Sequence, residues 1–230
     1  MKYYIYVSDS KVDMLFPQVP HEIKKKIATE WKIDLKILSA SRKSETEAEE
    51  NRVVRLEAVT SFIQEYGNIG SIEEPADYIY GTLDMKWASL PAADVPVVYF
   101  IASTGNTYLC LAGSPKHMLG NLHGESGYVS SSATPLMVHH LAQCLESQDM
   151  SGGPLTDANL ELLRKNNYGK AASFTGTQLA LETVRRAVVE LSGPEQQFEF
   201  LAKRLLEGQP PGDGTKKCLL LSPLYLALAS

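Results

Sequence analysis

The residues whose types best suit chemistry lie in the segment GSPKHMLG, residues 113–120, which directly follows a predicted strand. A glycine such as Gly113 lets backbone amides approach an anion, and Ser114, Lys116 and His117 can donate hydrogen bonds to a phosphate. The segment fits neither the GxxxxGK[ST] phosphate loop nor the GxGxxG dinucleotide pattern. It predicts a loop that binds an anionic ligand, and the alternative is an ordinary turn between two elements.

A second set of polar residues follows the first predicted strand. Asp9, Lys11 and Asp13 come directly after an alternating run at residues 2–8, in which aromatic and β-branched side chains favour a strand. Two carboxylates near an amine at the end of a strand are suited to a polar site. A plain turn is the alternative interpretation of this segment.

Other reaction types lack their sequence signatures. The five histidines are not spaced as metal ligands, and the adjacent pair His139 and His140 would point about 100° apart on a helix. No GxSxG nucleophile motif occurs, and the serines at 130–132 precede a predicted helix as loop and cap residues. We therefore expect no metal and no cofactor. His117 is the one candidate for a general acid or base.

Charge and composition limit the class of partner. The chain of 230 residues is 44% hydrophobic and 21% charged, values that favour a globular protein with a sizeable core. The formal net charge of −5 and the short basic run at 24–26, which is flanked by glutamates, offer no basic face. Duplex nucleic acid is therefore not expected as a partner.

Cysteine usage and hydropathy predict a cytoplasmic protein. The three cysteines are widely spaced, and Cys110 and Cys218 lie inside apolar, strand-like runs where a free thiol behaves as a small hydrophobe. The apolar start of the chain is too short for a signal peptide, and no apolar run approaches the roughly 18 residues of a membrane helix.

Periodicity predicts strands in the first half of the chain and helices in the second. Strands are expected at 2–8, 33–37, 78–88, 97–103 and 107–112, with a hairpin turn at 104–106. Helices are expected from Pro20, over 44–67, over 134–145, from Thr156, over 181–193 and over 198–208. The last apolar run, from Cys218, is expected to return as a strand.

This order of elements predicts an α+β fold in one domain spanning residues 1–230. The strands of the N-terminal half and the C-terminal strand would form a mostly antiparallel sheet, because a terminal strand must pair with the strands available. That sheet would pack against a helical C-terminal half.

Four segments also resemble an uncharacterised, largely actinobacterial family of domains of unknown function. They are YIYVSDSKVDML at 4–15, VYF leading to LAGSPKH across 98–117, FLAKRLL at 200–206 and SPLYLALA at 222–229. This family often has glycine where Leu221 precedes Ser222, so no backbone-approach role is expected there. The resemblance implies a cytosolic accessory protein, encoded near bacterial conflict or signalling genes. It also directs attention to residues 8–13, 113–120 and 222–225 as parts of one pocket.

These features favour binding over catalysis. We expect a sensing or adaptor module that binds a small anionic, nucleotide-like ligand or a partner protein. The groups expected to hold the anion are Lys11, Ser114, Lys116 and His117, with Gly113 and Ser222 in the same site. Asp9 and Asp13 would orient these groups or contact a hydroxyl. The alternatives are a nucleotide or phosphodiester hydrolase that uses His117, and a structural subunit of a larger assembly.

Overall fold

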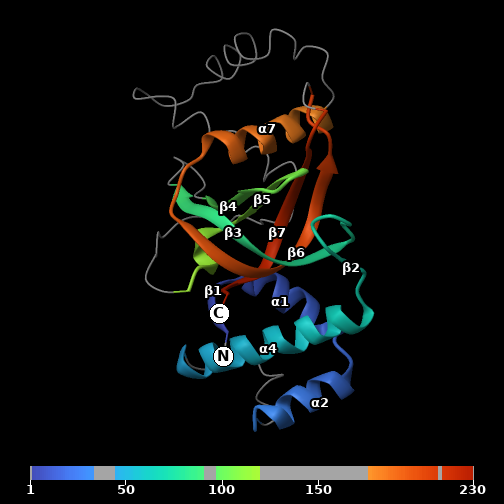
Figure 1. Cartoon of the computed structure of the whole chain (residues 1–230). Coiled ribbons are helices and arrows are strands. Elements are labelled where there is room, and N and C mark those ends of the chain that lie inside the picture. Colours follow the sequence, from blue (N-terminus) through green and yellow to red (C-terminus); the bar gives the residue numbers. More distant parts are fainter. Residues whose placement is uncertain (1, 34–44, 91–96, 120–175, 212–213, 230) are drawn as a thin grey trace.

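The computed structural model describes residues 2–33, 45–90, 97–119, 176–211 and 214–229 (Figure 1). The N-terminal part of the described chain holds β1 (Tyr3–Val7), α1 (Asp9–Leu15), a short 3-10 turn η1 (Phe16–Gln18), α2 (His21–Glu30) and α4 (Glu45–Tyr66). The central part holds β2 (Ile69–Gly70), β3 (Tyr78–Leu90), β4 (Val97–Ser103), β5 (Thr107–Gly113) and a second 3-10 turn η2 (Pro115–His117). The C-terminal part holds α7 (Gly176–Glu190), β6 (Glu195–Gly208) and β7 (Lys217–Leu228).

Five of the strands close into a mixed barrel. The order around it is β7, β5, β4, β3 and β6, and β6 then pairs with β7 to complete the ring (Figure 1). Each of these pairs is antiparallel except β5 with β7, which run parallel. The first half of β7 pairs with β5, and its second half pairs with β1. β7 therefore connects the barrel to the N-terminal strand.

Aromatic side chains fill the inside of the barrel. Phe100 stacks on Trp87 and meets Phe198 edge to face, and Phe200 is fully buried in the same cluster. The alternation of apolar and polar residues along β3 explains this arrangement, because Ile79, Leu83, Met85 and Trp87 share the face of the strand that packs into this cluster.

Helices cover the barrel on two sides. α7 packs on the outer face of β4, β5 and β7, in a layer that also buries the side chains of Cys110 and Cys218 (Figure 1). The helices α1, α2 and α4 form another layer against β1 and the second half of β7. None of the described helices has the length and apolar character of a membrane span.

The α+β class and most of the predicted strands are confirmed, and the helical C-terminal half is wrong. The described part of that half is mainly strand, and residues 198–208, predicted as a helix, lie in β6. Phe198, Phe200 and Ala202 alternate into the barrel, and the pairing of β6 with both β3 and β7 prevails over the helical spacing of its leucines. The predictions at 33–37, 134–145 and Thr156 lie wholly or mainly outside the described residues.

Candidate functional site

The structure places the three predicted polar segments next to one another. The backbone amide of Ser8 donates to the carbonyl of Leu224 at 2.9 Å, which joins the end of β1 to β7. On the other side of β1, the amide of Leu119 donates to the carbonyl of Ile5 at 2.8 Å. β1 is thus flanked by β7 and by the chain that leaves η2.

Residues 9–13 form the first part of helix α1 and not the turn that was one interpretation of the sequence. Val12 and Phe16, four residues apart, are both buried against the α2 and α4 layer, so tertiary packing supports this short helix. Residues on a helix are separated by about 100°, so Lys11 points about 200° away from Asp9. The helix therefore divides the predicted site into two groups.

Asp9 and Asp13 belong to the group that faces α4. Asp9 Oδ1 lies 2.7 Å from Arg52 Nε, and Asp13 Oδ1 lies 3.0 Å from Arg55. Arg52 also donates to the carbonyl of Val7 at 3.0 Å. These carboxylates attach α1 to α4, and the structure shows neither of them orienting Lys11.

Lys11 faces the opposite way, toward β7, and its side chain is only 7% exposed. Its ammonium donates to the hydroxyl of Ser8 at 3.2 Å and to the carbonyl of Pro223 at 3.0 Å. A register shift in the pairing of β6 and β7 occurs at this point, where Ala202 pairs with Pro223 and Leu201 with Tyr225. Such an irregularity redirects backbone groups, which here leaves the Pro223 carbonyl for Lys11.

Among the described residues, Lys11 has two neutral oxygen partners and no carboxylate. An ammonium has three N–H donors, so one donor is left for a further acceptor. Burial disfavours the charged form and lowers the pKa of Lys11 to about 8.

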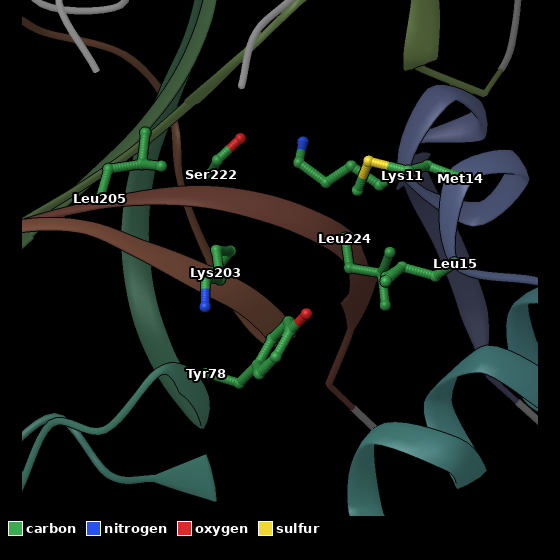
Figure 2. A pocket seen from close by; sticks show the side chains of 8 residues that line it. All are labelled: Lys11, Met14, Leu15, Tyr78, Lys203, Leu205, Ser222 and Leu224. Atoms are coloured by element: carbon green, nitrogen blue, oxygen red, sulfur yellow. The ribbon is translucent and has the colours of Figure 1, made fainter. Parts of the chain in front are cut away.

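A small pocket of about 120 Å³ opens beside this amine. Figure 2 shows Lys11 extending from α1 toward Ser222 of β7, with Tyr78 and Lys203 across from them. The rest of the wall is apolar and consists of Met14, Leu15, Leu205 and Leu224. Lys203 lies over the Tyr78 ring, 4.7 Å from its centroid, and its ammonium also lies 4.0 Å from Oδ1 of the exposed Asp77.

Residues 113–119, the described part of the predicted anion loop, do not line this pocket. His117 is buried, its ring meets Tyr6 edge to face, and its Nδ1 lies 3.8 Å from Asp9 Oδ2. The Ser114 carbonyl accepts the His117 amide, and Lys116 is exposed. Of the predicted site residues, the structure thus brings Lys11 together with Ser222, and Asp9 together with His117.

Sequence analysis missed the other pocket residues. Lys203 and Leu205 lie in a segment whose leucine spacing predicts a helix, although the phenylalanines of the same segment are spaced as in a strand. Tyr78 was correctly placed on the polar face of its strand, but nothing in the sequence pairs that strand with β6.

Gly113 serves the packing of the barrel. A Cβ atom at this position would lie 2.2 Å from the hydroxyl oxygen of Tyr6 and 2.8 Å from its Cζ. The space that glycine provides is therefore taken by a fully buried tyrosine ring.

Replacing Gly113 with alanine is expected to lower the free energy of unfolding by about 1–3 kcal/mol, the usual cost of overpacking. The Tyr6 ring is held between Phe100 and His117 and has little room to move. Urea denaturation measures the change. Gly105→Ala is the control, because an added methyl group there meets nothing within 4 Å. Equal stability of the two variants would contradict the close contact.

The fold and pocket define a small mixed β-barrel protein with a cationic, partly apolar pocket where α1 meets β7. A family model described as a family of unknown function, DUF7019, matches residues 2–230. The chain therefore belongs to this family, in agreement with the resemblance seen in its sequence. Comparison with curated proteins gave no match, and comparison with solved structures gave none.

Proposed function

We propose that this protein is a sensing or adaptor module that binds a small anion in the Lys11 pocket without reacting with it. The observation that carries the proposal is the buried Lys11 ammonium, which has no carboxylate partner among the described residues. A buried charge with neutral partners alone is unfavourable. An anion that enters the pocket would supply the missing countercharge.

The pocket wall indicates the chemistry of the ligand. Lys11 attracts negative charge, and the Ser222 hydroxyl can take part in hydrogen bonding, while leucine and methionine side chains favour an apolar part. The volume of about 120 Å³ is below the roughly 300 Å³ of a typical ligand pocket. The ligand is therefore a short carboxylate, or a larger molecule such as a nucleotide that inserts only its anionic group.

The position of the pocket supports a sensing role. Lys11 belongs to α1, and its partners are Ser8 at the end of β1 and Pro223 on β7. Asp9 and Asp13 connect the same helix to α4. An anion bound to Lys11 would strengthen the contact between α1 and the barrel, and α4 would respond because it is attached to α1.

Thermal-shift measurements on the full chain test this proposal. Butyrate, inorganic phosphate and adenosine monophosphate are suitable probes, because they differ in apolar content and size. At least one is expected to raise the melting temperature of the wild type by mass action. The same ligand, at the same concentration, should raise the melting temperature of Lys11→Met much less than that of the wild type. It should still stabilise Lys86→Met, which removes an exposed lysine. An equal shift in all three proteins would contradict the site, and turnover of the nucleotide would favour the hydrolase alternative.

The affinity of the pocket for butyrate is expected to fall as pH rises through about 8. Binding needs the Lys11 ammonium, and in the free protein that group loses its proton around its pKa of about 8. Affinity should be nearly constant below about pH 7 and fall roughly fivefold between pH 8 and 9. Butyrate is fully ionised throughout this range, so the change of affinity with pH reports a titration of the protein and not of the ligand. Isothermal titration calorimetry measures it, and a flat affinity up to pH 10 would contradict the role of Lys11.

A further inference from the structure

A serine, a histidine and an aspartate meet on the other side of α1 from the Lys11 pocket. The exposed Ser10 places its Oγ 3.4 Å from Nε2 of His117, and Nδ1 of the same ring lies 3.8 Å from Oδ2 of Asp9. A nucleophile on one ring nitrogen and a carboxylate on the other is the arrangement by which serine hydrolases activate a hydroxyl. The sequence pointed to His117 as a candidate acid or base, but no motif indicated Ser10.

From this geometry we infer that Ser10 is the nucleophile of a second site, which hydrolyses small carboxylic esters, with His117 as general base. The site goes beyond the proposed anion binding and does not depend on it, because adjacent residues Ser10 and Lys11 point about 100° apart on the helix.

His117 has the surroundings that such a base needs. It is 3% exposed, and its Nδ1 faces the Asp9 carboxylate at 3.8 Å, a distance longer than that of a full hydrogen bond. Burial lowers the pKa of His117, and the carboxylate of Asp9 partly offsets that effect. The imidazole is therefore neutral near pH 7, which is the form that accepts a proton.

Three further charged side chains act on the Asp9 carboxylate or on the His117 ring. Arg52 binds the second carboxylate oxygen of Asp9 at 2.7 Å and so fixes the position of that side chain. The positive charges of Lys11 and Lys116 disfavour the protonated ring. Both distances in the group exceed the roughly 2.6–3.2 Å of a closed triad, and free enzymes often show such looser contacts.

The reaction proceeds in two balanced steps. Ser10 Oγ attacks the ester carbonyl carbon while its proton passes to His117 Nε2. A bond forms between Oγ and that carbon, the bond from the carbon to the alcohol oxygen breaks, and the alcohol leaves with the proton from Nε2. Water then attacks the acyl-serine and gives a proton to His117. The Oγ–carbon bond breaks, the carboxylic acid leaves, and Ser10 regains its proton.

Labelling of the full chain with a fluorophosphonate probe tests the inference, together with hydrolysis of p-nitrophenyl acetate. Peptide mass spectrometry is expected to find the label on Ser10. Ser10→Ala and His117→Gln should each reduce hydrolysis by about a hundredfold or more, while Ser103→Ala, which changes an exposed serine on β4, should match the wild type. Labelling of Ser10 no greater than that of Ser103, or labelling unaffected by His117→Gln, would overturn the site.

The pH profile of wild-type labelling gives an answer even if His117→Gln fails to fold. The rate at Ser10 is expected to be level near neutral pH and to fall in acid, as His117 gains a proton. Asp9→Asn should move the midpoint of this fall to lower pH, because it removes the carboxylate that favours the protonated ring. A rate that rises in proportion to hydroxide across the whole range, with no inflection, would contradict a histidine base.

Discussion

Lys11→Met is expected to weaken binding of the anionic ligand by about ten- to a hundredfold. A hydrogen bond to a charged group contributes about 1.5–3 kcal/mol, and Lys11 is the buried cation of the pocket. Methionine retains the length and apolar character of the lysine stem but offers no donor. Isothermal titration calorimetry on both proteins measures the difference.

The stability of the free protein should change much less. The substitution removes a buried charge, and that favours the variant. It also leaves the Pro223 carbonyl without the donor it has in the wild type, at a cost of about 1–3 kcal/mol. Because these effects oppose each other, a retained fold with lost binding is the expected combination. Lys86→Met supplies the control for a lost positive charge, and unchanged affinity in Lys11→Met would rule out Lys11 as the anion-binding group.

Phe200→Ala is expected to lower the free energy of unfolding by about 3–5 kcal/mol. Phe200 is fully buried in the aromatic cluster of the barrel, on a strand that pairs with both β3 and β7. Alanine would leave a cavity where three strands meet. Chemical denaturation followed by circular dichroism measures the loss.

The matched variant is Leu205→Ala on the same strand. Leu205 was on the apolar stripe of the helix that the sequence predicted, while Phe200 was not. In the structure Leu205 is only partly buried, so its truncation should cost less than that of Phe200. A larger loss for Leu205→Ala than for Phe200→Ala would contradict the strand and support the helix.

β6 also shows why the fold was only partly predictable. Strands with a clear alternation, such as β3, and helices with a clear stripe, such as α7, were identified from local pattern alone. The segment of β6 has leucines at helical spacing and phenylalanines at strand spacing, so local pattern fits both. The choice is made by pairing with two other strands. The paired residues of β3 are more than 100 positions away in the sequence, and those of β7 are between 10 positions (Gly208 with Cys218) and 30 positions (Phe198 with Leu228) away. Closure of the barrel depends on the same long-range pairing.

The candidate site was predictable in its parts but not in its arrangement. Lys11 and Ser222 were identified as polar interruptions near strand ends, and they do line one pocket. Asp9 was assigned to the same group, because the sequence did not reveal that α1 begins there and turns it toward Arg52. The Pro223 carbonyl that receives Lys11 is a backbone group, which no side-chain pattern indicates.

The central claim is that Lys11 is a buried ammonium that binds an anion. Measuring the pKa of Lys11 with and without ligand tests this claim most directly. NMR detection of the lysine ε-carbon across a pH titration gives this value. We predict a pKa of about 8 in the free protein, and a rise when butyrate or another bound anion is present, since the anion favours the charged form. A pKa near the ordinary value of 10.5, or one that does not move when the probes are added, would contradict the account.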